Sequence, residues 1–272
     1  MDTEQERWNE YGRRQTARIA EHPEQFHIDR DVFPMPYRLD DHQVADLHRI
    51  LGSLEGKRVL ELGCGYGRFA TYLTRHGASV TAIDLGFDLV TSTRALAQVN
   101  EAEVDGAQAT IAALPFAPGS FDAVIGLAVL HHLPEAAAAA AIADARRVLR
   151  DPGVAVFYET IEDSPAFNFL QMLVPAGSSG QEQYRPSILN RKAWREFKEH
   201  DDEREMTSAE FFRAGAVFSS TRLYKYGLLG RLHRINALRR FKGAFGAADR
   251  VLLGRVPPLS RFARFALIEY RT

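Results

Sequence analysis

The stretch Val59-Leu-Glu-Leu-Gly-Cys-Gly-Tyr-Gly-Arg68 constrains the fold of this chain more than any other part of the sequence. Its apolar first half predicts a buried strand over residues 58–62, and the alternating glycines predict a tight loop before a helix that begins near Arg68. Glycine lacks a Cβ, so the loop can turn sharply and let a ligand contact its backbone. The N–H groups at the start of the following helix suit a carboxylate or a phosphate.

The glycine spacing excludes two common phosphate-binding loops. A dinucleotide fingerprint needs a glycine at its sixth position, which is Arg68 in this chain. A P-loop needs Gly-Lys-Ser/Thr, whereas the chain has Arg68-Phe-Ala. What remains is an acid, Glu61, followed by Gly-x-Gly-x-Gly. Taken alone, this pattern is also compatible with a strand-to-helix turn in any α/β protein.

Composition narrows the class of protein. The chain has 272 residues, 46% of them apolar, which suits one α/β domain with additions. A formal net charge of −1 gives no overall attraction to nucleic acid, and we expect no nucleic-acid partner. The single cysteine, Cys64, cannot form an internal disulfide, and the amino-terminal residues do not form a signal peptide. No apolar run approaches the ~20 residues of a membrane span, so we expect a soluble cytoplasmic protein.

Strands and helices alternate five times between residues 57 and 160. After the first strand, apolar stretches predict strands at 79–84, 108–111, 123–127 and 154–159. Such alternation predicts a parallel sheet with helices on both faces, and ligands of such sheets lie at the carboxyl ends of the strands. The chemistry-bearing residues expected at that edge are Glu61 to Gly67, Asp84, Thr110 to Ala112, Leu127 to His132, and Glu159.

Asp84 ends the second predicted strand, about 20 residues beyond the glycine loop. At that place a carboxylate can accept hydrogen bonds from both hydroxyls of a ribose. An aspartate at a strand end is otherwise a common helix N-cap. The preceding glycine loop favours the ribose role.

The flanking regions divide the chain into four predicted parts. Residues 1–56 form an N-terminal helical cap, and residues 57–160 form the nucleoside-binding core. Residues 161–207 form a helical insertion over the site, which includes a charged helix at 191–205. Residues 208–272 complete the sheet with a short helix and two further strands.

The segment 222–264 is strongly basic. It carries 11 Lys or Arg and one acid, Asp249, with apolar residues at helical spacing between them. A basic amphipathic helix can lie on a membrane surface or bind an anionic substrate. It can also be a solvated face over a core, which is the commoner case.

These motifs together resemble the class I S-adenosylmethionine (AdoMet) methyltransferase family. Two further motifs, Leu114-Pro-Phe before Phe121-Asp122 and Leu130-His-His-Leu-Pro134, carry the resemblance beyond the glycine loop. Residues 77–87 are similar to the ubiquinone-biosynthesis O-methyltransferase branch. The resemblance implies an α/β, Rossmann-like, doubly wound, seven-stranded sheet whose last strand, near Phe265, is antiparallel.

The resemblance also implies a cofactor site for AdoMet, with S-adenosylhomocysteine as the product. The residues that it places in this site are Arg38, Glu61, Gly63, Cys64, Gly65, Gly67, Asp84, Leu85, Thr110, Ile111 and Leu127. Glu61, the glycine-loop backbone, Leu127 and Arg38 would hold the methionine part. Asp84 would hold the ribose, and Leu85 would pack on the adenine.

Two positions depart from the family pattern. Thr110 stands where the family has an Asp that accepts from the adenine amino group, so the hydroxyl of Thr110 or the backbone of Ile111 must serve instead. The ubiquinone branch carries Glu-x-x-Glu-His after the fourth strand, where this chain has Ala128, His131 and His132. We therefore predict no metal and assign no quinol substrate.

The predicted reaction is methyl transfer to a small-molecule acceptor, at a hydroxyl oxygen. A hydroxyl nucleophile needs a base, and the candidates are His131, His132 and Glu159. His132 is preferred, since it lies at the strand-four edge and can titrate near neutrality, although it could instead pack or cap the next helix. The alternatives are a lipid or glycolipid methyltransferase at a membrane surface and a non-catalytic partner protein of the same fold.

Overall fold

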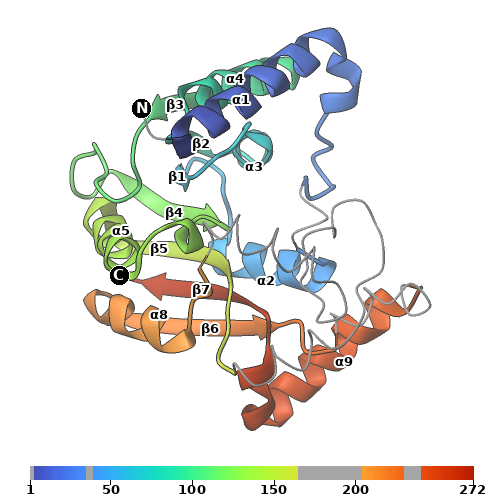
Figure 1. Ribbon diagram of the computed structural model, residues 1–272, viewed down its shortest axis with the longest axis vertical. Coiled ribbons are helices and arrows are strands. Elements are labelled where there is room, and N and C mark those ends of the chain that lie inside the picture. Colours follow the sequence, from blue (N-terminus) through green and yellow to red (C-terminus); the bar gives the residue numbers. More distant parts are fainter. Residues whose placement is uncertain (1–2, 35–38, 165–203, 230–239) are drawn as a thin grey trace.

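The computed structural model describes residues 3–34, 39–164, 204–229 and 240–272 (Figure 1). The strands are β1 (Arg58–Leu62), β2 (Ser79–Asp84), β3 (Val104–Gln108), β4 (Phe121–Leu127), β5 (Leu149–Thr160), β6 (Ser220–Tyr226) and β7 (Phe265–Arg271). The α-helices are α1 (Thr3–Glu21), α2 (Asp41–Leu51), α3 (Arg68–Arg75), α4 (Phe87–Val99), α5 (Glu135–Val148), α8 (Ser208–Ala214) and α9 (Lys242–Arg255). Short 3-10 turns are η1 (Pro23–Phe26), η2 (Leu130–His132), η3 (Gly215–Val217) and η6 (Pro257–Phe262).

The strands form one seven-stranded sheet in the order β3-β2-β1-β4-β5-β7-β6. The first five pair in parallel, and β7 runs antiparallel between β5 and β6. The order reverses at β1, whose neighbours are β2 and β4. The crevice at such a reversal is where open parallel sheets bind ligands.

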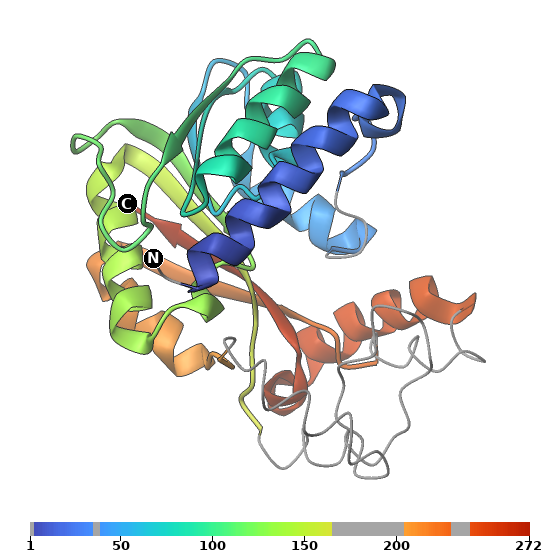
Figure 2. The ribbon, with the colours of Figure 1, turned by 45° about the horizontal axis from the view of Figure 1, so that its top comes forward.

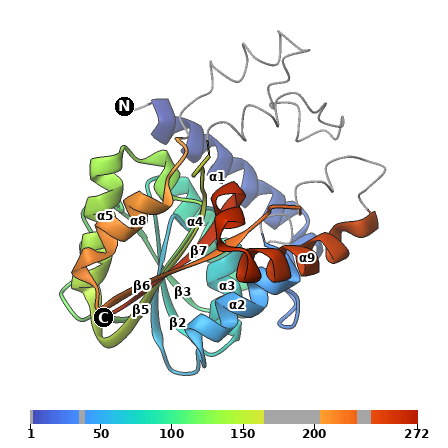
Figure 3. The ribbon, with the colours of Figure 1, turned by 90° about the horizontal axis from the view of Figure 1, so that it is seen from below.

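Side chains alternate between the two faces of the sheet and build a separate core on each. On one face, β1 residue Val59 packs with apolar residues of α2 and α3. On the other face, Leu60 and Leu62 pack with apolar residues of α5 and with Phe211 of α8. Figure 3 shows the two groups of helices on either side of the sheet. The expected doubly wound sheet with an antiparallel last strand is therefore confirmed.

The third strand lies four residues earlier than its predicted position. The predicted strand was 108–111, whereas β3 pairs with β2 from Val104 to Gln108. Asp105 and Gly106 made this stretch unlike a strand, but Gly106 lies against Val90 of α4, where a side chain would not fit. The following residues, Ala109 to Ile111, leave the sheet and turn into the ligand edge.

The N-terminal helices form as predicted. α1 ends at Glu21, just before His22-Pro23, and α2 begins after Asp40, which forms a capping box with Gln43. Figure 2 shows α1 lying alongside α4. The two helices approach closely at Gly12, where a Cβ would overlap the backbone of Asp88.

The region after β5 is described only in part. The predicted helix at 191–205 lies almost wholly outside the described residues, as do residues 230–239 of the basic segment. α8 forms as predicted, with a capping box between Thr207 and Glu210. In the described parts of the chain, no helix is long and apolar enough to cross a bilayer. The division into four parts stays a prediction.

Candidate functional site

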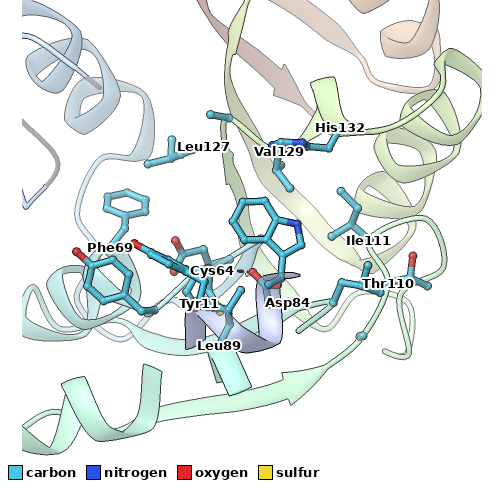
Figure 4. A pocket seen from close by; sticks show the side chains of 18 of the residues that line it. Tyr11, Cys64, Phe69, Asp84, Leu89, Thr110, Ile111, Leu127, Val129 and His132 are labelled. Carbon is cyan, nitrogen blue, oxygen red and sulfur yellow. Dashed lines mark hydrogen bonds between the residues drawn. The ribbon is translucent and has the colours of Figure 1, made fainter. Parts of the chain in front are cut away.

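A cavity of about 240 Å³ opens at the carboxyl edge of the sheet, where β1, β2 and β4 end. Figure 4 shows Leu127, Val129 and His132 along one side, with Cys64, Asp84 and Leu89 along the opposite side. The lining residues are Trp8, Tyr11, Glu61, Gly63, Cys64, Gly65, Tyr66, Arg68, Phe69, Asp84, Leu85, Leu89, Ala109, Thr110, Ile111, Leu127, Ala128, Val129, His132 and Leu133. Most of the predicted cofactor residues therefore meet in one cavity.

The glycine loop forms the floor of the cavity. Gly63, Gly65 and Gly67 all have positive φ, at 67°, 56° and 87°. A Cβ on Gly67 would lie 2.5 Å from Cγ2 of Thr93, so this glycine lets α4 pack against the loop. A Cβ on Gly65 would meet nothing within 4 Å, because this position faces open space. Here the loop backbone is accessible to a ligand.

Glu61 ends up buried beside the loop, with 3% of its surface exposed. Its Oε2 atom has no hydrogen-bond partner among the described residues. Burial raises the pKa of Glu61 well above its ordinary value, and the negative charge of Asp84 raises it further. A buried carboxylate oxygen without a donor is a site for a ligand cation or N–H group.

Asp84 connects the end of β2 to the glycine loop. Its Oδ2 accepts from the N–H of Gly65 at 2.9 Å, and its Oδ1 accepts from the N–H of Gly86 at 3.1 Å. Burial raises the pKa of Asp84, and these hydrogen bonds oppose the rise. Because each carboxylate oxygen can accept two bonds, both oxygens can still accept from ligand hydroxyls.

Leu85, Thr110 and Ile111 line the same cavity. The Oγ1 of Thr110 accepts from the N–H of Ala112 at 3.3 Å, which leaves its O–H as a donor. The Nε2 of Gln108 donates to the carbonyl of Leu85 at 2.9 Å and fixes the backbone between the two segments. Leu85 and Ile111 give this part of the cavity an apolar lining.

Cys64 lines the cavity, and its thiol is directed toward α4. The Sγ atom lies 3.5 Å from Oγ1 of Thr93. Burial raises the pKa of the thiol well above its ordinary value. Since the thiolate is the nucleophilic form, the environment of Cys64 does not favour covalent chemistry.

The three predicted acid–base residues occupy different places. His132 lines the cavity, whereas His131 and Glu159 lie behind it. Glu159 is fully buried, and its Oε1 accepts from the N–H groups of Val129 and Leu130 at 2.9 and 2.7 Å. Its Oε2 accepts from Nδ1 of His131 at 2.6 Å. This geometry gives Glu159 and His131 an anchoring role for η2.

The wall beside His132 is aromatic. Trp8 and Tyr11 of α1 line the cavity, and the Trp8 ring meets the His132 ring edge-on, with centroids 6.0 Å apart. Tyr11 packs in turn on Tyr66 of the glycine loop, with centroids 6.2 Å apart. Sequence reasoning did not place Trp8 in the site. The available signal was its three-residue spacing from Tyr11, which puts both rings on one helical face.

Two further expectations concern Arg38 and the absence of a metal. Arg38 lies outside the described residues, so its predicted contact with the AdoMet carboxylate stays a prediction. In the described segments, no cluster of three or more His, Cys, Asp or Glu side chains has an arrangement that could hold a metal. The imidazole of His131 forms a hydrogen bond with the carboxylate of Glu159.

The sheet order, the glycine loop and the acid at the end of β2 define a class I, Rossmann-like methyltransferase fold. Residues 60–157 match the methyltransferase domain family. The solved S-adenosylmethionine-dependent methyltransferase from Mesorhizobium loti has the same fold, with a TM-score of 0.54 and 18% identity over 84% of this chain and 96% of that one. The expected resemblance is confirmed.

Curated relatives carry the name of the expected branch. The chain is 36% identical over 151 residues to a ubiquinone biosynthesis O-methyltransferase from Azotobacter vinelandii, covering 52% of this chain and 63% of that protein. It is 38% identical over 168 residues to the same-named protein from Alkalilimnicola ehrlichii, covering 58% and 65%. The matches thus span less than two thirds of each relative's length.

Proposed function

We propose that the protein is an AdoMet-dependent methyltransferase that acts on a hydroxyl oxygen of a small-molecule acceptor. The observation that carries the proposal is the cavity that joins the unpartnered Oε2 of Glu61 to Asp84 across an open glycine loop. The relatives named as O-methyltransferases support oxygen as the acceptor atom. A non-catalytic partner role is less favoured, because such a protein has no need of this cavity.

The described residues fit AdoMet in three places. Glu61 would accept from the ammonium group of the methionine part, and Asp84 would accept from the ribose hydroxyls. Leu85 and Ile111 would enclose the adenine. When bound, AdoMet supplies a methyl group on a sulfonium, which is a good leaving group without acid assistance. The protein's main task is then to hold the acceptor oxygen in line with that methyl group.

His132 is the proposed general base. It lines the cavity next to Leu133 and Trp8, so an acceptor hydroxyl held there lies within reach of an imidazole nitrogen. A positioned base contributes ~10²–10⁴-fold to such a step. We expect His132→Asn to lower kcat by about this factor and to leave affinity for S-adenosylhomocysteine unchanged. Loss of that affinity would assign His132 to the cofactor site instead.

Calorimetric titration with AdoMet and S-adenosylhomocysteine tests the cofactor. Asp84→Asn should weaken binding by about 10–100-fold, the usual effect of losing hydrogen bonds to a charged group. The matched control is Asp105→Asn on the neighbouring strand β3, whose exposed side chain is outside the cavity. Transfer of labelled methyl groups to a panel of hydroxylated compounds then identifies the acceptor. Absence of binding by the wild-type protein would reject the proposal.

Two further parts of the proposal concern location and surface contacts. We propose a cytoplasmic protein whose segment 222–264 makes weak contact with anionic groups. Within the described part of that segment, the acid Asp249 is buried and accepts from the N–H of Leu229. The exposed charges there are basic, and Phe241, Val251 and Val256 are exposed beside them. This surface suits an anionic membrane more than a nucleic acid.

A further inference from the structure

The 3-10 turn η2 carries His132 into the cavity, and a turn this short leaves backbone groups unsatisfied at both ends. At the first end of the turn, the carboxylate of Glu159 accepts hydrogen bonds from the N–H groups of Val129 and Leu130. The preceding residue, Ala128, has a φ of 57°, a left-handed conformation that is unfavourable for a side chain with a Cβ. The path of the chain into η2 is therefore imposed by its surroundings.

At the other end of the turn, Arg204 donates hydrogen bonds to two backbone carbonyl groups. Its backbone N–H donates to the carbonyl of His131 at 3.0 Å, and its Nε donates to the carbonyl of Leu133 at 2.6 Å. Its Nη1 donates to Oε2 of Glu210 at 2.6 Å. Glu210 also belongs to the capping box of α8. The guanidinium thus links the start of α8 to the turn that holds His132.

We propose that Arg204 is a positioning residue for the acceptor side of the site. It acts through the backbone on either side of His132, and it is not among the residues that line the cavity. This inference deepens the proposed function and depends on it for the acceptor. Loss of the guanidinium should displace His132 on the acceptor side of the site. It should leave the cofactor residues Glu61 and Asp84 in place.

The contact between Trp8 and His132 provides a measurement that requires no acceptor. A protonated imidazole against an indole quenches its fluorescence, so Trp8 emission should fall as His132 takes up a proton. Among the described residues, Tyr11 and the permanently charged Arg7 also lie near Trp8, and the ring centroids of His131 and His132 are 4.3 Å apart. His132→Asn identifies which part of the pH response belongs to His132.

The experiment uses Trp194→Phe as its background, so that Trp8 is the remaining tryptophan of the chain. Arg204→Met keeps the aliphatic stem and removes the guanidinium. We expect it to shift or abolish the His132-dependent quenching step and to keep affinity for S-adenosylhomocysteine. Arg204→Lys keeps one donor and should restore the step in part.

The matched control is Arg213→Met. Arg213 is on α8, a few residues beyond Arg204, and its Nη2 pairs with the side chain of Glu135, the first residue of α5, at 2.6 Å, whereas Arg204 bonds the backbone carbonyls around His132. It should leave the quenching step unchanged. If Arg204→Met behaves like Arg213→Met, or loses affinity for S-adenosylhomocysteine, the positioning role is wrong. If Arg204→Met does not fold, Glu210→Gln decides, because it weakens the hold on the guanidinium and should produce a smaller shift of the same step.

The two proposals fail in different ways. A wild-type protein that binds neither AdoMet nor S-adenosylhomocysteine would reject the methyltransferase function. The Trp8 titration would still show whether Arg204 sets the position of His132. A wild-type protein with no His132-dependent quenching would overturn the inference about Arg204 and leave the cofactor proposal standing.

Discussion

The carboxyl groups of Glu61 and Asp84 lie close enough that the charge of one raises the pKa of the other. Both carboxyl groups line the cavity in the ligand-free protein, where no bound cation offsets their charge. The folded protein therefore tolerates repulsion that a positively charged ligand would remove. Binding of AdoMet should accordingly be accompanied by release of a proton wherever Glu61 is protonated in the free protein.

The raised pKa of Glu61 has a consequence for stability. At pH values between the ordinary glutamate pKa of ~4.3 and the raised pKa of Glu61, this side chain is protonated in the folded state and ionised in the unfolded state. The free energy of unfolding of the ligand-free protein should then fall as pH rises through this window. Glu61→Gln should flatten this dependence in urea unfolding series, and Glu103→Gln on the surface should not. Equal pH slopes in wild type and Glu61→Gln would contradict the assignment.

Gly67 allows a test of the loop itself. Alanine at this position would combine a φ of 87° with a Cβ 2.5 Å from Thr93. We expect Gly67→Ala to lower the free energy of unfolding by about 2–4 kcal/mol, from backbone strain plus overpacking. Gly119→Ala has a similar φ of 67° but no atom within 4 Å, so about 1–2 kcal/mol is expected. Chemical denaturation measures the difference, and equal losses would show that packing on α4 is unimportant.

Sequence reasoning succeeded at residues whose position follows from spacing along the chain. Glu61 is the penultimate residue of β1, and Asp84 is the last residue of the neighbouring parallel strand β2, so both had to reach the same edge of the sheet. Trp8 could not be placed in that way. Its position depends on how α1 rotates on α4, and the close approach at Gly12 sets that rotation. From the sequence alone, a glycine within a polar helix does not indicate which other helix packs against it.

Among the elements, β3 shows the limit of propensity. The apolar pattern of the sequence predicts a strand at 108–111, whereas β3 pairs with β2 from Val104 to Gln108. Backbone pairing and contact with α4 outweighed the unfavourable Asp105 and Gly106. By contrast, β1 and β2 agree with their predicted positions, because each has a buried apolar pattern and a glycine turn close to its end.

The docking of α1 on α4 is another element whose effect can be measured. Asn9 accepts from the N–H of Asp88 in the first turn of α4, and Arg13 pairs with the Asp88 carboxylate at 2.9 Å. Asn9→Ala should cost about 1 kcal/mol of stability, like the loss of a helix cap. It should also weaken S-adenosylhomocysteine binding, since Trp8 and Tyr11 are on the same helix.

The control for Asn9 is Arg14→Ala, an exposed change on the same helix. Thermal unfolding and calorimetric titration of both variants separate the two effects. If Asn9→Ala lowers stability but leaves affinity unchanged, α1 contributes to the fold without closing the cavity.

For the molecule as a whole, the distribution of charge matters more than the net charge of −1. Exposed arginines gather around α9 and η6, at positions 240, 250, 255 and 261. On an anionic surface each such residue contributes about 1 kcal/mol, and salt weakens the contribution. A nearly neutral chain can therefore still have one face that favours anions.

Cosedimentation with vesicles tests this face. Arg255→Gln combined with Arg261→Gln should weaken binding to anionic vesicles by about 2 kcal/mol, or about 30-fold, with no effect on neutral vesicles. Arg14→Gln combined with Arg30→Gln makes the same change of charge at exposed positions elsewhere. Equal losses in both double variants would mean that overall charge, and not this face, governs the contact.

The pairing of α1 with α4 also constrains how the protein is made. α1 is synthesised before the helix that it packs on, since α1 ends at Glu21 and α4 ends at Val99. At ~5–20 residues per second, α1 leaves the ribosome seconds before its partner exists. Ile19, which is buried in the finished protein, must be tolerated in water during that interval. Most other residues of α1 are polar, which keeps the unpacked segment soluble during this interval. The aromatic wall of the cavity forms only when α1 packs on α4.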